Sequence, residues 1–322
     1  AVVGGVVVAV FGGSHITISG PGNGLVIVLL AAITSLGGGD LYQGYLFTLA
    51  AIILSGGLLF LFGALRLGAM SEFFPASALQ GMLAAIGVGI LAKQFHVMLG
   101  LTSVSGDTIE QLMRIPDSLL LFLGFHPFAG IIGVISILFL FFYSKIRNPY
   151  FHLIPAPMWV VVGSIGVGYY YQLVLKEVVP IPPELLIKIP EKIISALPRP
   201  NFEKLLDLDF LGVVVSITLI AVIESLLSIK AVDKLDLKKR RSNVNKDLRA
   251  LGLASIVSGF LGGLNVVTVI ARSSVNANNG GTNRSANFFH AMFLVLFVVL
   301  LGDQIQRIPL TALAAILVFT GY

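Results

Sequence analysis

The chain has 322 residues, of which 56% are hydrophobic and only 11% are charged, and its mean hydropathy is +0.95. This composition excludes an ordinary soluble domain and predicts an all-α polytopic membrane protein. The formal net charge is +5 at pH 7, and cysteine is absent, which excludes a disulfide framework and a thiolate metal site. We expect no metal, no cofactor and no nucleic-acid partner.

Apolar runs between polar breaks predict a series of membrane segments. They are expected at residues 1–12, 19–36, 43–65, 73–99, 117–143, 155–175, 208–231, 248–263, 266–277, 286–302 and 308–322. Both ends of the sequence lie inside apolar runs, and no charged leader precedes the first run, so we interpret the chain as a fragment. We expect a single transmembrane domain, with a first repeat over about 1–176, an outer loop over about 177–207 and a second repeat over about 208–322.

Glycine-marked breaks interrupt two of these segments. Ser19-Gly20-Pro21-Gly22-Asn23-Gly24 precedes an apolar run that is short for a membrane crossing, which needs roughly 20 apolar residues. Pro21 suits the first position of a helix. Gly262-Gly263 precedes a second short run, which ends in a polar tail after Arg272. Each break predicts a half-helix, because irregular backbone at membrane depth is tolerated only inside protein or beside a wet cavity.

The starts of the two half-helices form the candidate anion site. The first turn of a helix presents unpaired N–H groups and the positive end of the dipole, and both favour anions. Two interrupted segments in corresponding halves of a chain are typical of inverted-repeat transporters, whose substrate lies between the half-helix ends. We therefore predict that the two starts, the second near Thr268, face each other close to the bilayer midplane. The candidate anion-binding residues are Gly22, Asn23, Gly24, Thr268, Val269, Ile270 and Arg272.

Charged loops predict the orientation of the chain in the plasma membrane, which we expect to be a bacterial inner membrane. Residues 233–249 are dense in lysine and arginine, which places this loop in the cytoplasm. Lys145, Arg147 and Arg66 fall on the same side, and the mixed charges of residues 176–209 suit the outer face. The basic loop either serves topology alone or also binds membrane lipid or a partner.

One carboxylate lies in the middle of an apolar segment. Glu224 follows Leu219-Ile220-Ala221-Val222-Ile223, and a charge there is costly unless it faces a cavity or a partner. Ser228 lies one turn further along and shares its face. We assign Glu224 and Ser228 to a coupling ion, and the alternative is a protonated Glu224 that is hydrogen-bonded between helices. Arg272 neutralises Glu224, attracts anions, or extends its charge to the cytoplasmic surface.

Several motifs, in this order along the chain, resemble the SulP family of inorganic anion transporters, the relatives of prestin and pendrin. The motifs are Ser19-Gly20-Pro21, Phe74-Pro75-Ala76-Ser77-Ala78-Leu79-Gln80-Gly81, Glu224-Ser225-Leu226-Leu227-Ser228, Asn245-Lys246-Asp247-Leu248, Ile256-Val257-Ser258-Gly259-Phe260-Leu261-Gly262-Gly263-Leu264 and Ala271-Arg272-Ser273-Ser274-Val275-Asn276. The resemblance implies a seven-plus-seven inverted-repeat fold with core and gate domains, and an anion between the third and tenth segments. It also implies elevator-like alternating access and, commonly, a cytoplasmic STAS domain.

The sequence departs from the family pattern in three respects. The run 1–12 resembles the second segment of the family, so we expect a fold that lacks the first segment. The last two segments and the STAS domain are also missing from this sequence. Asn265 stands where the family frequently has proline, and we expect its side chain to cap the second half-helix instead.

The expected function is secondary active transport of a small inorganic anion, with bicarbonate or sulfate favoured, by symport with a proton. The resemblance places Glu224 where sodium-coupled bicarbonate members carry Asp and many presumed proton-coupled members carry Glu. We favour the proton because Ser228 and Thr268 are a thin set of oxygen ligands for sodium. A passive anion channel, an exchanger and a sodium-coupled bicarbonate transporter are the alternatives. The full-length protein is expected to be a homodimer.

An enzyme is a remote alternative. Gly37-Gly38-Gly39-Asp40 matches the Gly-x-Gly-Asp motif of intramembrane aspartyl proteases. That chemistry needs two carboxylates in one site, and no Tyr-Asp partner occurs in another segment. Asp40 lies in a polar turn between predicted segments, so we predict that the protein is not an enzyme.

Overall fold

The computed structural model describes residues 1–69, 76–101, 106–146, 155–176, 180–187 and 197–321. Within these residues the chain is helical apart from one short two-stranded ribbon. It forms two compact units, Ala1–Leu79 with Lys192–Phe297, and Gln80–Glu191 with Val298–Tyr322. Each unit thus takes segments from both halves of the sequence, an interleaving that is consistent with core and gate domains. Phe74 and Pro75 of the family-like motif lie outside the described residues.

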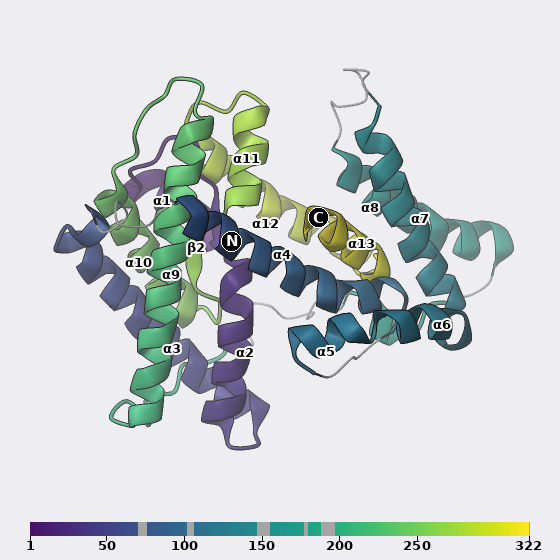
Figure 1. The fold of residues 1–322 in the computed structure, drawn as a ribbon, viewed down its shortest axis with the longest axis horizontal. Helices are drawn as coiled ribbons and strands as arrows, with labels where there is room; N and C mark the ends of the chain where they lie inside the picture. The colour runs from purple at the N-terminus through teal and green to yellow at the C-terminus, as the bar shows by residue number, and fades with distance from the viewer. Residues whose placement is uncertain (70–75, 102–105, 147–154, 177–179, 188–196, 322) are drawn as a thin grey trace. The chain divides into compact units, whose positions relative to one another are not determined.

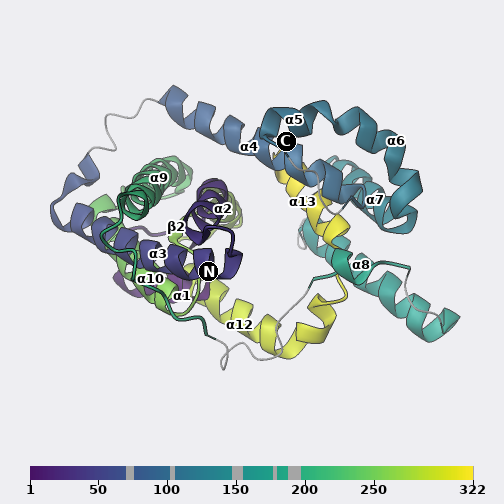
Figure 2. The same ribbon diagram turned by 90° about the horizontal axis from the view of Figure 1, so that it is seen from below.

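The first unit contains both predicted breaks. Its elements are α1 (Val2–Phe11), β1 (Ser19–Pro21), α2 (Asn23–Gly37), α3 (Leu41–Ala64), α9 (Leu208–Leu235), α10 (Val244–Phe260), β2 (Val266–Thr268), α11 (Ile270–Asn278) and the first part of α12 (Ser285–Ile305). Helix α3 packs along α10 and also contacts α2 and α9 (Figures 1 and 2). Leu49, Ile52, Phe210, Ile217 and Leu251 are fully buried in the core of this unit. Burial of large aliphatic and aromatic side chains is the main term that stabilises this packing.

Two glycines allow α3 and α10 to approach closely. A Cβ atom on Gly252 would lie 2.5 Å from the backbone nitrogen of Phe60 and 2.6 Å from the carbonyl oxygen of Gly56. A Cβ atom on Gly56 would lie 2.8 Å from the carbonyl oxygen of Gly252. Small residues at such crossings let helix backbones touch, as is common in membrane proteins.

The Gly37-Gly38-Gly39-Asp40 segment is a turn that starts α3. Gly38 and Gly39 have φ angles of 54° and 105°, which favour glycine. The Asp40 carboxylate accepts hydrogen bonds from the backbone N–H groups of Tyr42 at 2.8 Å and Gln43 at 3.2 Å. Asp40 is therefore an exposed helix cap, the ordinary use of aspartate at this position.

The second unit corrects one predicted segment. Its elements are α4 (Ala76–Met98, which starts in the first unit), α5 (Thr108–Met113), α6 (Ile115–Phe125), α7 (Pro127–Ser144), α8 (Ala156–Tyr170), a π-helical turn (Tyr171–Leu175), a 3-10 turn (Pro183–Leu185), the end of α12, and α13 (Leu310–Gly321). The single segment predicted over 117–143 is wrong, because it contains the two helices α6 and α7. Pro127 lacks an N–H and disfavours helical geometry at His126, whose φ and ψ are −136° and 70°. Helix α13 packs against α7 and α8.

Among the described residues, five helices are long and apolar enough to cross a membrane. They are Leu41–Ala64, Pro127–Ser144, Ala156–Leu175, Leu208–Leu235 and Ser285–Ile305. The shorter apolar helices include α1 and α2, and the short length of α2 is expected for a segment that a break interrupts. The structure thus confirms a polytopic membrane fold.

Candidate anion and coupling-ion site

The two predicted breaks pair directly with each other. Strand β1 is the first part of the first break and runs antiparallel to β2, with Ser19 opposite Thr268 and Pro21 opposite Val266. The ladder continues past the strands, where the Val269 N–H donates to the Ile18 carbonyl oxygen at 3.0 Å. Strand β1 leads into α2, and β2 leads into α11. The two breaks therefore lie side by side in the fold. That the starts of the two half-helices face each other near the bilayer midplane, and that they bind an anion, stay predictions.

Both half-helices start later than predicted. Helix α2 begins at Asn23 with Gly22 as its N-cap, so Pro21 is a strand residue and not the first helical residue. Helix α11 begins at Ile270 with Val269 as its N-cap, and Thr268 belongs to β2, where it is 1% exposed. Strand pairing explains both differences, because it satisfies backbone groups that an earlier helix start would leave free.

Asn265 does not cap α11 as we expected. Its side chain is 1% exposed and accepts a hydrogen bond from the Ser255 hydroxyl of α10. The same hydroxyl accepts the Val266 N–H at 3.0 Å. Asn265 therefore anchors the start of β2 to α10, and neither half-helix receives a hydrogen bond from the side chain of its own N-cap residue.

Glu224 reaches the start of α2. This residue of α9 is 7% exposed, and its carboxylate lies against Gly22, the N-cap residue of the helix. Its Oε2 atom has no hydrogen-bond partner among the described residues. A carboxylate of the protein itself thus occupies part of the N-terminus that we predicted to hold an anion. Ser228, one turn further on α9, is 2% exposed, and the adjacent Ser225 is fully buried with an unpartnered hydroxyl.

Glycines of the first break make room for two charged side chains. A Cβ atom on Gly22 would lie 2.7 Å from both carboxylate oxygens of Glu224. A Cβ atom on Gly20 would lie 2.7 Å from the Nη1 atom of Arg272, a residue of α11 that is otherwise exposed. Glu224 and Arg272 therefore approach the first break at positions two residues apart.

The two charges do not form an ion pair. In the part of the chain that the structure describes, the ion pairs are Arg114 with Glu110 and Arg240 with Asp236. The hypothesis that Arg272 neutralises Glu224 is accordingly not supported by the geometry. The guanidinium group is left free to attract an anion, since its own negative partner is missing within the described residues.

Side chains to which the sequence analysis gave no individual role hold the first break and the segment before it in place. Asp247, the buried acid of the Asn245-Lys246-Asp247-Leu248 motif, accepts the N–H groups of Gly13 at 2.7 Å and Ser14 at 3.1 Å. Asn287 of α12 bonds to Ser19, and Ser273 of α11 bonds to Ile18. A polar residue inside an apolar segment is a general sign of function in membranes, and this rule singles out Asn287 from the sequence.

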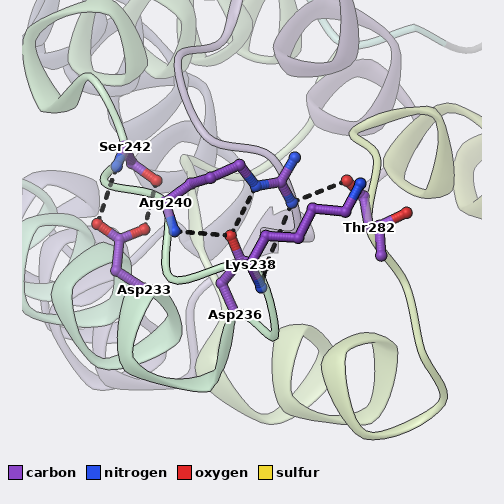
Figure 3. A network of polar contacts seen from close by, with 6 residues as sticks. All are labelled: Asp233, Asp236, Lys238, Arg240, Ser242 and Thr282. Atoms are coloured by element: carbon purple, nitrogen blue, oxygen red, sulfur yellow. Dashed lines mark hydrogen bonds and ion pairs between the residues drawn. The ribbon is translucent and has the colours of Figure 1, made fainter.

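Two aspartates order the basic loop between α9 and α10 (Figure 3). Asp236 accepts hydrogen bonds from Arg240 Nε at 2.8 Å and Nη2 at 3.1 Å, and the hydrogen bonds from Arg240 lower the pKa of its carboxyl to about 2. Arg240 Nη2 also donates to the carbonyl oxygen of Thr282 at 2.9 Å, which links the loop to the segment before α12. Asp233 accepts from the Ser242 hydroxyl at 2.5 Å. Arg240 is thereby committed to the fold, whereas Lys238, Lys239 and Arg241 are exposed.

Comparisons with known proteins match the whole chain. A family model described as "Sulfate permease family" matches residues 1–322. The "Putative sulfate transporter YvdB" of Bacillus subtilis is 25% identical over 323 residues, covering 100% of this chain and 57% of that protein. The "Bicarbonate transporter BicA" of Synechocystis sp. is 25% identical over 318 residues, covering 98% of this chain and 53% of that protein. The chain therefore spans about half the length of these curated relatives.

Solved structures share the fold. The transmembrane domain of a cyanobacterium bicarbonate transporter BicA matches with a TM-score of 0.78 and 23% identity, over 100% of this chain and 78% of that chain. Murine solute carrier 26 family member A9, in the inward-facing state, matches with a TM-score of 0.75 and 16% identity, over 99% of this chain and 54% of that chain. The predicted transporter fold is thus confirmed, and the paired breaks are consistent with its inverted repeat.

Proposed function

Because the chain belongs to the sulfate permease family of membrane anion transporters, we propose that the full-length protein moves a small inorganic anion together with a proton bound at Glu224. The proposal includes bicarbonate or sulfate as the anion and elevator-type movement of the first unit. One observation carries it: a buried carboxylate occupies the start of a half-helix and has an unpartnered oxygen and no cationic partner among the described residues. The family is one of transporters, which agrees with the prediction that the protein is not an enzyme.

Burial makes the charged form of Glu224 costly. An ionised side chain in a membrane segment is stable only if it is paired, hydrogen-bonded or solvated. Glu224 has the positive end of the α2 dipole in its favour, but its Oε2 atom remains unsatisfied. Binding a proton removes the charge, and this gives the residue a physical reason to exchange protons during a transport cycle.

An anion and a proton are expected to help each other to bind. A second negative charge beside an ionised Glu224 is repelled, and it also competes with the carboxylate for the positive end of the α2 dipole. Protonation of Glu224 weakens both effects, so the affinity for the anion rises. By linkage, the bound anion must raise the affinity for the proton by the same factor, which is the thermodynamic requirement for symport.

The second half-helix, α11, offers groups that attract the anion. The first N–H groups of α11, those of Ile270, Ala271 and Arg272, precede the intrahelical bond from Ser273 to Val269. The Arg272 side chain lies beside Gly20 on the same ribbon. Backbone N–H groups and a guanidinium group suit an oxyanion, and they select for charge and size. The names of the relatives, a bicarbonate transporter and a putative sulfate transporter, are consistent with either substrate.

Sodium coupling is the main alternative for the ion. A sodium site would use oxygen atoms around Glu224, and Ser225, Ser228 and Thr268 are the buried hydroxyl residues on the elements nearby. The described residues contain no group of three or more His, Cys, Asp or Glu side chains suited to a metal ion. Only the unpartnered Ser225 hydroxyl adds to the sodium ligands that we expected from the sequence.

Uptake into sealed vesicles that contain the full-length protein tests the proposal. Labelled bicarbonate and sulfate are supplied under an imposed pH gradient, and separately with sodium replaced by a large organic cation. We expect concentrative uptake that follows the pH gradient and persists without sodium. Glu224→Gln should abolish the response to the gradient, while Glu203→Gln, which alters an exposed loop carboxylate, should leave it unchanged. Uptake that collapses without sodium and ignores the gradient would refute proton coupling, and purely downhill flux would indicate a channel.

The wider assembly is part of the proposal. We propose that the full-length protein is a homodimer, and that the exposed lysines and arginine of the basic loop bind anionic lipid headgroups at the cytoplasmic surface. Mass measurement of the purified protein in nanodiscs, with and without anionic lipid, tests both statements.

A further inference from the structure

Ser19 lies on the outer edge of the ribbon. Strands β1 and β2 are antiparallel, so alternate residues of β1 direct their N–H groups toward β2 and away from it. Ile18 faces β2, as the bond from the Val269 N–H to its carbonyl oxygen shows. The N–H of the next residue, Ser19, therefore points away from β2 and needs another partner, because Ser19 is fully buried.

Asn287 of α12 supplies that partner. Its Oδ1 atom accepts the Ser19 N–H at 3.0 Å, and its Nδ2 atom lies 3.3 Å from the Ser19 hydroxyl, to which it donates. Asn287 is itself 1% exposed. A side-chain amide offers one acceptor and two donors, so it can take the place of a peptide group in a neighbouring strand. A helix that begins seventeen residues after the end of β2, at Ser285, thereby completes the hydrogen bonding of β1.

Helix α11 reinforces the same strand. The Ser273 hydroxyl accepts the Ile18 N–H at 2.8 Å and donates to the Val269 carbonyl oxygen at 2.7 Å. It therefore bridges the backbone segments of β1 and β2 at one end of the ribbon. Asn276 donates from Nδ2 to the Ile16 carbonyl oxygen at 2.8 Å. The chain from Ile16 to Ser19 is thus fixed by side chains from the second half of the sequence.

We propose that Asn287 is a positioning residue of the anion site, an inference that rests on the proposed function. By holding Ser19, the amide fixes the next residue, Gly20, against the guanidinium group of Arg272. It also fixes the strand that leads into Gly22 and the start of α2. Loss of the amide leaves a buried N–H without its partner and lets the strand shift to regain one, which changes the distances between the groups that hold the anion.

The test compares three variants of the full-length protein in the uptake assay. Asn287→Ala removes both hydrogen bonds to Ser19, and we expect the KM for the anion to rise about tenfold, with little change in the maximal rate. Ser19→Ala removes only the bond to the hydroxyl, and we expect a rise of about threefold. The matched control is Asn279→Ala at the C-cap of α11, because the side chain of this exposed asparagine donates to the last turn of that helix, to the Val275 carbonyl oxygen at 2.8 Å. Its KM should equal that of the wild type.

A double variant separates positioning from general destabilisation. With Asn287 replaced, the Ser19 hydroxyl has lost its partner, so Ser19→Ala with Asn287→Ala should have the KM of Asn287→Ala alone. The inference is overturned if the rise in KM of the double variant equals the product of the rises in the two single variants. An unchanged KM in Asn287→Ala, or a fall in its maximal rate with a normal KM, would also overturn it. If Asn287→Ala does not fold, the KM of Ser19→Ala decides, and a wild-type value overturns the inference. Wild-type uptake that ignores the pH gradient refutes proton coupling instead and leaves this comparison intact.

Discussion

Replacement of Gly22 by alanine tests the contact between the first break and Glu224. The new Cβ atom would lie 2.7 Å from both carboxylate oxygens and 2.5 Å from the Cγ2 atom of Val267. Ordinary carbon contacts begin near 3.4 Å, so the carboxylate must retreat by roughly 1 Å and leaves the N-terminus of α2. Overpacking costs about 1–3 kcal/mol, and the attraction of a carboxylate to a helix N-terminus is worth about 0.3–2 kcal/mol.

These magnitudes predict a loss of about tenfold or more in pH-driven uptake by Gly22→Ala, since about 1.4 kcal/mol corresponds to a factor of ten. Gly57→Ala is the matched control, because no atom lies within 4 Å of its added Cβ. A second change separates the overlap from the lost contact: Glu224→Asp shortens the side chain by one carbon–carbon bond of about 1.5 Å, so together with Gly22→Ala it should regain part of the melting temperature but not the pH-driven uptake, because the carboxylate is then withdrawn from α2. If Gly22→Ala transports and melts like Gly57→Ala, the carboxylate does not lie beside Gly22 and the proposed geometry is wrong.

Three further perturbations probe other parts of the fold. Arg272→Gln should raise the KM for the anion about tenfold at an unchanged melting temperature, measured by uptake and by scanning fluorimetry. Gly252→Ala should lower the free energy of unfolding by about 1–3 kcal/mol, read from denaturation of the purified protein, because its Cβ would meet the backbone of α3. Asp236 has a pKa of about 2 in the fold against 3.8 for the free group, so its stabilisation is complete above about pH 4 and is lost toward pH 2. Limited proteolysis should therefore cleave the basic loop faster in Asp236→Asn than in the wild type at neutral pH. The two cleavage rates should converge as the pH falls toward 2.

The sequence carried enough information for the breaks, but not for their pairing. Gly20, Pro21 and Gly262 interrupt apolar runs, and an interrupted run in lipid has few stable solutions. Composition and periodicity therefore predicted the membrane class and the two half-helices. The ribbon between them depends on hydrogen bonds across about 250 residues, a range at which local patterns have no signal. For this reason the half-helices were predicted to begin at residues that in fact form β1 and β2.

Asn265 shows how a plausible local rule fails in a packed site. An asparagine before a half-helix commonly caps it, and this expectation uses only sequence neighbours. The structure offers Asn265 a better partner in Ser255, a residue of α10 that lies against it in the buried interior. The His126-Pro127 break is the opposite case. Proline disfavours helical geometry in the residue before it, and this local rule alone is sufficient to divide the segment into two helices. The long apolar run around Pro127 led to the prediction of a single segment.

In the proposed symport, the separation of Glu224 and Arg272 decides how a proton affects the binding of the anion. From the sequence, an ion pair between them was one of three possibilities, and in that arrangement each would have reduced the other's effect on an anion. In the structure, Glu224 lies at Gly22 and Arg272 lies at Gly20, with no ion pair between them. One end of the ribbon is therefore governed by a group that a proton can neutralise, and the other by a group that stays positive at any physiological pH. In the proposed mechanism, protonation of Glu224 makes the electrostatic potential at the site more positive, which favours the anion. The proton can then control anion binding without a conformational change that links Glu224 to Arg272.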